Sequence, residues 1–471
     1  MSFDPVARGL ASRPRYVAGR RLAIIGHSHG RQNHNWTTGI VSNEYRGEIT
    51  QAQRMMGHTF TCDVIYDAAY TGVPVWNSRG FRGQNCSISG AIGSDLAAQV
   101  TAALATRPRA VACMISENDV TALRAPAALR AEIQAAAARI VEGAGRPFII
   151  RAGISRPTSQ WASGSDQRKM LRHNNDWLHD TFNGRPGCFV VDPNTVLMDG
   201  SNADGVPISG YFAGDNQHLS NIGGYVSAKN VWVPVLKTIF PGAPRYFGWA
   251  PDNIYDATLD SAGNVRNPLG NLAPNPNLSG TGGTRGTGTS GPAGIATGWR
   301  IDNATAGGVI TAVVTMGIDS VLGAAAGYFL HLAFTMPGGG SSSETFTFRP
   351  ATDFDVSAFP NAWMRAGFYM RRSAGAGLFN RTDVFVKDNG NPSADVMQWY
   401  GLRSFDTTLP LVTEAEEGFV VTPPFKLGPT PTTLRLAANI GLYGAMTGSP
   451  TADIGMPFCM PIADPNLTLF N

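Results

Sequence analysis

The chain has 471 residues, of which 43% are hydrophobic and 15% are charged, and its formal net charge is +3. This length predicts two domains, and the hydrophobic content suffices for sizeable cores. Because no long run of Lys or Arg stands out, nucleic acid is not expected as the main partner, since phosphate binding needs a concentrated basic patch. The 55 glycines and 31 prolines indicate many turns and a large β component.

The sequence shows no targeting segment and no disulfide framework. The first 20 residues lack the apolar core of a signal peptide, and no apolar run is long enough to span a bilayer. We therefore expect a soluble protein without a signal peptide, either virion-associated or extracellular by a non-classical route. The odd number of cysteines and the lack of Cys-x-x-Cys pairs favour small buried thiols at Cys62, Cys86, Cys113, Cys188 and Cys459.

From about residue 20 to 245, short apolar strands alternate with helical stretches. This pattern is typical of an α/β domain, in which helices cover a parallel sheet, and we place that domain at 1–245. The predicted strands are RLAIIG (21–26), CDVIYD (62–67), AVACMIS (110–116), PFIIRAG (147–153) and CFVVD (188–192). The predicted helices cover 94–106, 125–145, 165–182 and 220–240, the last interrupted by Pro234.

The second half of the chain has a different composition. Residues 246–298 are rich in Gly, Pro, Asn, Ser and Thr, which predicts a linker that leads into a further domain. Residues 299–471 are predicted to form an all-β sandwich of the jelly-roll type, because no convincing helix interrupts their strand-like runs. These runs cover 307–317, 328–336, 344–350, 363–372, 382–388 and 434–444.

The first predicted strand ends in Gly26-His-Ser-His-Gly30, a pattern in which a tight turn exposes a serine oxygen. In α/β-hydrolases this turn follows an inner strand, after an oxyanion loop has been built. Ser28 instead follows the first strand, so the α/β-hydrolase interpretation fails on position. In a doubly wound sheet, ligands bind beyond the carboxyl ends of the strands, and the loop that holds Ser28 lies there.

Three further polar loops are expected at the same edge of the sheet. Gly90 lies just before a helix, Asn118 follows the third strand in MISENDV, and Asp215 and His218 are three residues apart before the last helix. Acyl transfer needs a nucleophile, a base, an acid that orients the base, and oxyanion donors. Together with Ser28, these loops supply residues of each kind.

The order and the local sequences of these four segments resemble those of the SGNH hydrolases, also called GDSL-type esterases and lipases. Over residues 20–240, the four conserved sequence blocks of that family are matched in order by IIGHSHG, SISG, SEND and DNQH. The resemblance implies a flavodoxin-like α/β/α domain with a five-stranded parallel sheet. It also implies that Ser28 is the nucleophile, His218 the general base and Asp215 the acid that orients it. The implied oxyanion donors are the backbone N–H groups of Ser28 and Gly90 and the side chain of Asn118.

Two positions depart from the family pattern. His27 stands where the family usually has Asp, and Ser116 stands where it usually has Gly. Neither replaced residue performs the chemistry, so we interpret both as variation in the supporting residues. His27, His29 and His34 crowd Ser28, but a metal site needs three or four converging ligands, and we interpret these histidines as polar rim residues. No metal or other cofactor is expected.

Arg79, Arg82 and Trp36 are the candidates for contact with a substrate. The two arginines lie in an insertion before Gly90, where a solvated loop is the alternative. Trp36 could stack on a sugar or simply pack. Four aromatic residues in the second half leave the same choice between glycan binding and sandwich core, namely Trp363, Tyr369, Trp399 and Tyr400.

The segment NLAPNPNL…GIATGWRI is similar to the opening of carbohydrate-binding jelly rolls, and similar Gly/Thr-rich stretches precede β-domains in bacteriophage tail proteins. The two halves together predict a serine esterase that removes O-acetyl groups from a polysaccharide. The alternatives are a lipase or thioesterase of the same family, or a glycan-binding adhesin with a degenerate site. The sequence leaves open a homo-oligomer or a virion assembly.

Overall fold

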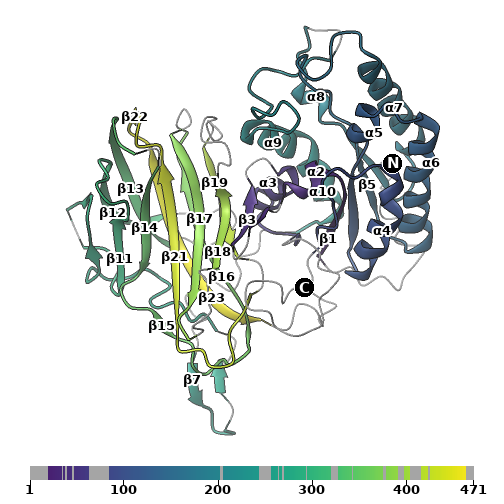
Figure 1. The fold of residues 1–471 in the computed structure, drawn as a ribbon. Helices are drawn as coiled ribbons and strands as arrows, with labels where there is room; N and C mark the ends of the chain where they lie inside the picture. The colour runs from purple at the N-terminus through teal and green to yellow at the C-terminus, as the bar shows by residue number, and fades with distance from the viewer. Residues whose placement is uncertain are drawn as a thin grey trace, which may run out of the picture.

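The computed structural model has two halves that lie side by side, an α/β half and a β half (Figure 1). The small parallel sheet and its helices lie on the right of Figure 1, and the long strands of the β half lie on the left. The structure describes residues 20–33, 35–37, 40–44, 47–62, 84–201, 205–242, 256–263, 265–267, 270–292, 294–319, 327–341, 343–374, 378–390, 397–403, 415–422 and 425–462.

A parallel sheet forms the centre of the α/β half. Among the described residues it has four strands, in the order β1 (Leu22–Gly26), β4 (Ala110–Met114), β5 (Phe148–Arg151) and β6 (Cys188–Val191). All residues of β1, β4 and β5 are buried, which explains their continuous apolar sequences. These four predicted strands are confirmed. Most of the fifth, over 62–67, lies outside the described residues.

Helices cover both faces of this sheet. Alternate residues of a strand point to opposite faces, and both sets are apolar here, so each face needs a helical layer that shields it from water. Ile25 packs in one apolar cluster with residues of three helices, and Ile24 packs in another on the opposite face. Figure 1 shows α3, α9 and α10 on the side of the sheet that faces the β half. The helices are α3 (Glu48–Met55), α4 (Leu96–Ala105), α6 (Pro126–Ala137), α7 (Asp166–Phe182), α9 (Asn221–Ser227) and α10 (Val233–Ile239). The four predicted helical regions are confirmed, with π-helical segments at 138–143 and 228–232, while α3 was not predicted.

The β half is a sandwich of two sheets around a large apolar core. One sheet has the order β10-β12-β13-β23-β16-β19, and the other has the order β2-β3-β18-β17-β21-β14-β11-β9. The short strands among these are β2 (Asn35–Thr37), β3 (Ile40–Glu44), β9 (Thr284–Arg285) and β10 (Thr289–Ser290). All six predicted strand-like runs are confirmed. The main strands are β11 (Trp299–Asn303), β12 (Thr311–Asp319), β13 (Gly327–Pro337), β14 (Glu344–Pro350), β16 (Trp363–Arg372), β17 (Phe379–Asp388), β18 (Met397–Arg403), β19 (Glu416–Val421), β21 (Thr433–Leu442) and β23 (Thr451–Ile462).

Part of the segment predicted as a linker belongs to the sandwich. Within residues 246–298, β9 (Thr284–Arg285) pairs with β11, and β10 (Thr289–Ser290) pairs with β12. Leu278 and Ile295 are buried in the sandwich core. The prediction of a linker from composition was wrong for these residues, because glycine also permits close approach of two backbones. A Cβ atom on Gly283, for example, would collide with the carbonyl oxygen of Ala296.

A hairpin from the α/β half extends a sheet of the β half. It consists of β2 (Asn35–Thr37) and β3 (Ile40–Glu44), which pair antiparallel a few residues after Ser28. β3 in turn pairs parallel with β18. The chain therefore leaves the α/β half directly after the candidate nucleophile and returns to it at α3.

A buried ion pair also joins the two halves. Arg54 of α3 donates to the carboxylate of Glu416 on β19 at 3.3 Å, and Glu416 also accepts from Arg372 of β16 at 2.8 Å. Next to this pair, the His58 ring donates from Nε2 to the carbonyl oxygen of Phe419 at 2.9 Å. The two halves thus share backbone pairing and buried side-chain contacts.

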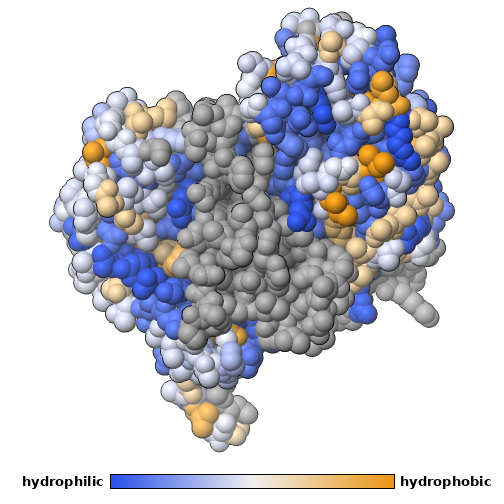
Figure 2. Space-filling view, viewed as in Figure 1, coloured by the Kyte–Doolittle hydropathy of each residue, from blue (hydrophilic) through white to orange (hydrophobic). Residues whose placement is uncertain are grey.

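Among the coloured atoms in Figure 2, hydrophilic and intermediate residues predominate, and the strongly hydrophobic ones lie in small scattered groups. All five cysteines are buried free thiols, which confirms that prediction. Within the described part of the chain, no helix has both the length and the apolar character needed to cross a membrane.

Candidate active site

Ser28 lies at the sharp turn that follows β1. Gly26 ends the strand with a φ of +122°, and a Cβ atom there would collide with the carbonyl oxygen of Met114 on β4, so only glycine fits. The short helix α2 (Ser28–Arg31) begins directly at the serine. Gln99 of α4 holds the turn, because its Nε2 donates to the carbonyl oxygen of Gly26 at 3.1 Å. The turn therefore places Ser28 at the carboxyl end of β1.

Ser28, His218 and Asp215 form a hydrogen-bonded series. The Ser28 Oγ lies 2.8 Å from Nε2 of His218, and Nδ1 of the same ring lies 2.6 Å from Oδ2 of Asp215. The other oxygen of Asp215 accepts from the backbone N–H groups of Gln217 and His218 at 2.9 and 3.0 Å. In this geometry the imidazole can take the hydroxyl proton while the carboxylate holds the ring.

The environment of Asp215 keeps its carboxylate ionised. Partial burial alone would raise the pKa of Asp215, but the hydrogen bonds from the His218 ring and from two backbone N–H groups bring that pKa below its ordinary value. Asp215 is therefore negative at neutral pH. A negative Asp215 favours the His218 tautomer with its proton on Nδ1, which leaves Nε2 as the acceptor for the Ser28 proton.

Gly90 lies on a loop that contacts Asn118, the second residue of the short helix α5 (Glu117–Thr121). The Asn118 side chain donates from Nδ2 to the carbonyl oxygen of Ala91 at 3.0 Å. Gly90 is exposed with a φ of +81°, and no atom lies within 4 Å of the place a Cβ would take. The N–H of Ile88 donates to the carbonyl oxygen of Gly26 at 3.0 Å, which ties this loop to the turn before Ser28. The role of Gly90 and Asn118 as oxyanion donors stays a prediction.

His27 and His29 are buried, which corrects the prediction that they lie at the polar rim. They are 1% and 4% exposed. Nε2 of His27 lies 2.6 Å from the carboxylate of Glu117, and Nε2 of His29 donates to the carbonyl oxygen of Gln217 at 3.2 Å. Each of the two rings is held in the interior by its hydrogen-bond partner. Burial, and then the charge of Arg151, hold the pKa of His29 well below 6.5, so His29 is neutral at pH 7.

The buried histidines do not form a metal site. Both ring nitrogens of His27 are hydrogen-bonded, Nε2 to the Glu117 carboxylate and Nδ1 to the backbone N–H of His29. Nε2 of His29 is hydrogen-bonded to the carbonyl oxygen of Gln217. Across the described ranges, no three His, Cys, Asp or Glu side chains are grouped so that they could hold a metal ion.

The predicted contact residues divide into buried side chains and side chains that are not described. Trp363 and Tyr369 are 6% and 3% exposed, so they pack inside the β half and do not offer a flat surface to a sugar. Outside the described residues or side chains lie Arg79, Arg82, His34, Trp36, Trp399 and Tyr400.

Sequence reasoning missed three charged residues behind the site. Glu117, Arg151 and Glu48 are 0%, 0% and 2% exposed and contact one another. One signal was present in the sequence, because Arg151 ends the apolar run FII and a charge inside a buried strand needs a buried partner. The identity of that partner could not be read from the sequence.

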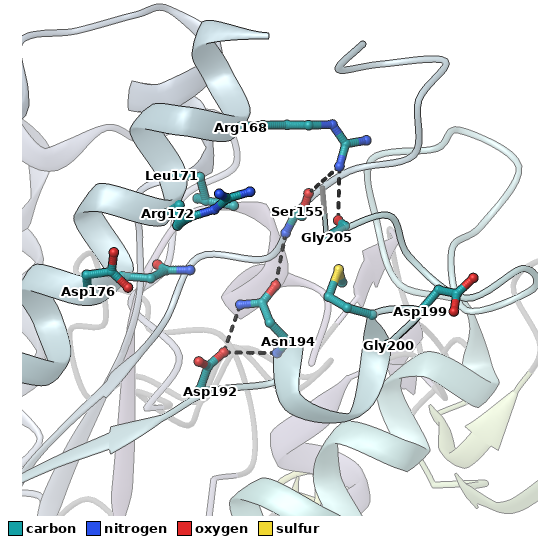
Figure 3. Close-up of a pocket in the computed structure, with 12 residues that line it drawn as sticks. Ser155, Arg168, Leu171, Arg172, Asp176, Asp192, Asn194, Asp199, Gly200 and Gly205 are labelled. Carbon is teal, nitrogen blue, oxygen red and sulfur yellow. Dashed lines mark hydrogen bonds between the residues drawn. The ribbon is translucent and has the colours of Figure 1, made fainter. Parts of the chain in front are cut away.

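A pocket of about 320 Å³, lined mostly by polar and charged residues, lies at the carboxyl ends of β5 and β6. Figure 3 shows Ser155 and Asn194 between Asp176 on one side and Asp199 on the other. The N–H of Ser155 donates to the Asn194 side chain at 3.2 Å. Arg172 adds a positive charge to the lining. Its size and its hydroxyl, amide and carboxylate groups suit a small polar ligand.

The α/β half resembles the SGNH hydrolases in its four sequence blocks and in the place that each block takes in the sheet. No protein-family model matches the chain, and no curated protein matches it. Among solved structures, a GDSL-like lipase from Bacteroides thetaiotaomicron is 10% identical, with 50% of this chain and 97% of that chain covered and a TM-score of 0.31. A carbohydrate esterase of family 3 from Talaromyces cellulolyticus is 16% identical, with 47% and 97% covered and a TM-score of 0.31.

A further solved structure is similar to a smaller part of the chain. It belongs to carbohydrate-binding modules of the β-sandwich superfamily and is 13% identical, with 34% of this chain and 56% of that chain covered and a TM-score of 0.23. At such scores these likenesses add nothing to the chemistry of the site, which rests on the residues and their distances.

Proposed function

We propose that the chain is a serine esterase that works through a covalent acyl-enzyme, with Ser28 as nucleophile. The observation that carries this proposal is the series Ser28 Oγ to His218 Nε2 at 2.8 Å and His218 Nδ1 to Asp215 Oδ2 at 2.6 Å. A hydroxyl is a weak nucleophile at neutral pH, and a base at this distance overcomes that weakness.

In the proposed reaction, the Ser28 oxygen bonds to the ester carbonyl carbon while its proton passes to Nε2 of His218. The resulting oxyanion is held by the backbone N–H groups of Ser28 and Gly90 and by the Asn118 amide, and each such donor is worth about 10²- to 10³-fold in rate. Collapse breaks the bond to the alcohol, which leaves with the proton from His218. Water then attacks the acyl carbon and gives a proton to His218. Collapse of this second intermediate breaks the bond between the acyl carbon and the Ser28 oxygen, which takes the proton back from His218 as the acid is released.

For the substrate, we favour the O-acetyl ester of a polysaccharide. The pocket at the ends of β5 and β6 combines hydroxyl, amide and charged groups with apolar surface, which supports a sugar-like ligand. Ser155, which lines it, directly precedes Arg156, whose guanidinium is near enough to Asp215 for the two charges to interact. The β-sandwich that accompanies the catalytic half fits a role in holding a glycan or in assembly.

A longer acyl chain is the second candidate, favoured by exposed apolar side chains on the catalytic loops. Ile88 is 56% exposed two residues before Gly90, Leu123 is 50% exposed shortly after Asn118, and Ile208 is 37% exposed on the segment that leads to His218. A series of nitrophenyl esters of increasing chain length separates the two candidates. Preference for acetate supports the first, and preference for long chains supports a lipase or thioesterase.

The deciding test compares the wild-type chain with Ser28→Ala. We expect the wild type to release acetate from acetylated glycans and to react with a fluorophosphonate at Ser28, and we expect Ser28→Ala to do neither. Equal acetate release from both proteins would overturn the proposal. Glycan retention without any labelling of Ser28 would identify the chain as a binding protein.

A further inference from the structure

A continuous series of buried side chains, one histidine and three charged groups, lies directly behind the nucleophile. His27 donates from Nε2 to Oε2 of Glu117 at 2.6 Å, and Arg151 donates to Oε1 of Glu117. Arg151 also donates from Nη1 to Glu48 at 2.9 Å. None of these four side chains is more than 2% exposed. They come from four elements, namely the turn before α2, the start of α5 (Glu117–Thr121), the end of β5 and the first residue of α3.

The hydrogen bonds fix the protonation and the orientation of the first two members. Nδ1 of His27 accepts from the backbone N–H of His29 at 3.3 Å, so the ring proton lies on Nε2 and points to Glu117. Burial would raise the pKa of Glu117, but the charge of Arg151 and the contact with His27 hold that pKa well below its ordinary value. Glu117 also accepts from the N–H of Ile154 at 3.0 Å, so both of its oxygens are engaged.

The far end of the series is held equally firmly. The second oxygen of Glu48 accepts from the Ser227 hydroxyl and from Nε1 of Trp232 at 3.0 Å. Buried charges of this kind are costly to desolvate, and apolar residues of similar volume usually stabilise a core as well or better. Stability alone therefore does not explain three such charges and a buried histidine behind one turn, whereas a need for fixed geometry does.

The two ends of the His27–Glu117 bond adjoin two different parts of the site. His27 directly precedes Ser28, and Glu117 directly precedes Asn118. We propose that His27 and Glu117 are positioning residues, which hold the Ser28 hydroxyl and the Asn118 amide at the separation needed to stabilise the oxyanion. This inference rests on the proposed esterase function.

The test compares two substitutions of His27 in the full-length chain. His27→Gln keeps a donor that reaches Glu117, whereas the side chain of His27→Asn is too short to reach it but can still accept from the His29 N–H. Glu117→Gln removes the carboxylate itself. Glu132→Gln is the matched control, because Glu132 pairs with Arg124 at 2.5 and 2.6 Å away from this series. The readouts are kcat and KM on nitrophenyl acetate, the rate of Ser28 labelling by a fluorophosphonate, and the thermal unfolding midpoint.

We expect His27→Asn and Glu117→Gln to lower kcat and the labelling rate by about 10- to 100-fold, with KM changed less than about threefold, because small displacements of reacting groups cost that much. His27→Gln should stay within about fivefold of the wild type, and Glu132→Gln should match it. Equal rates for His27→Gln and His27→Asn, or wild-type rates for Glu117→Gln, would overturn the inference. If Glu117→Gln does not fold, the two His27 variants decide alone, since both keep Glu117 paired with Arg151. A wild type that neither hydrolyses esters nor becomes labelled overturns the proposed function, and this inference with it.

Discussion

Each half of the chain holds a histidine hydrogen-bonded to an aspartate, and the two pairs are built for different purposes. In the α/β half, His218 lies 2.6 Å from Asp215 and faces the Ser28 hydroxyl. In the β half, His331 of β13 lies 2.8 Å from Asp453, directly opposite it on β23. Nearly identical pair geometry therefore says little about function, and the surroundings of the pair decide it.

The surroundings differ because of how the two sheets place their side chains. Antiparallel register lines up His331 and Asp453 with Arg371 of β16, whose guanidinium lies 3.7 Å from Asp453, so the charges form a cross-strand row. At the carboxyl edge of a parallel sheet, by contrast, loops from different strands converge on one place. A hydroxyl can meet the imidazole there from a loop 190 residues away.

The largest expected effect on kcat comes from replacing the aspartate of each His–Asp pair in turn. Asp215→Asn should lower kcat by about 10³- to 10⁴-fold, because an amide no longer holds the His218 tautomer that accepts the Ser28 proton. Asp453→Asn is the same chemical change in the β half and should leave kcat within about twofold, since no catalytic group contacts His331. Steady-state kinetics on nitrophenyl acetate measures both. A similar loss in the two variants, or none in Asp215→Asn, would contradict the contrast between the pairs.

A smaller effect is expected at the junction between the halves. Glu416→Ala leaves the buried guanidinium groups of Arg54 and Arg372 without their carboxylate, and breaking a buried pair in this way costs about 3–5 kcal/mol. Glu142→Ala is the matched control, because Glu142 pairs with Arg185 at 2.6 Å but is 64% exposed. Its loss should cost at most about 1 kcal/mol. Urea unfolding followed by tryptophan fluorescence compares the two midpoints, and equal shifts would mean that the junction is not tightly packed.

The smallest expected effect is a pH dependence of stability that originates in the α/β half. The ring of His29 faces Arg151, Glu117, His27 and His218, and its pKa in the folded chain lies well below the ordinary value of 6.5. Below pH 6.5 the unfolded chain therefore binds a proton that the folded chain does not. As the pH decreases below 6.5, this group therefore lowers the free energy of unfolding by up to about 1.4 kcal/mol per pH unit.

His29→Gln removes this titration and can still donate to the carbonyl oxygen of Gln217. We expect its free energy of unfolding to fall less steeply than that of the wild type between pH 6.5 and 5, as measured by urea unfolding at a series of pH values. Above pH 7 the two proteins should show the same dependence on pH. Parallel curves over the acid range would show that His29 is protonated in the folded chain.

Much of the fold could be predicted from the sequence because its signals are local. The apolar run at β1 and the Ser-Asp opening of the stretch that contains α4 identify a strand and a helix without reference to the rest of the chain. Residues 270–298 could not be assigned in this way, because glycine-rich sequence serves both for loops and for close packing against a sandwich. The hairpin of β2 and β3 was missed as well, since its pairing partner β18 lies more than 350 residues away.

The sequence by itself determined the alternation of strands and helices in the first half, the β character of the second, and the four polar blocks that follow predicted strands. These features depend on side-chain periodicity and turn chemistry, which act between neighbours along the chain. Only the tertiary structure decided that the Ser28 hydroxyl meets the His218 ring, that His27 and His29 turn inward, and that Glu117, Arg151 and Glu48 share one buried cluster. Such contacts depend on the exclusion of water and on pairing between distant segments, and residue order alone does not encode which partners will meet.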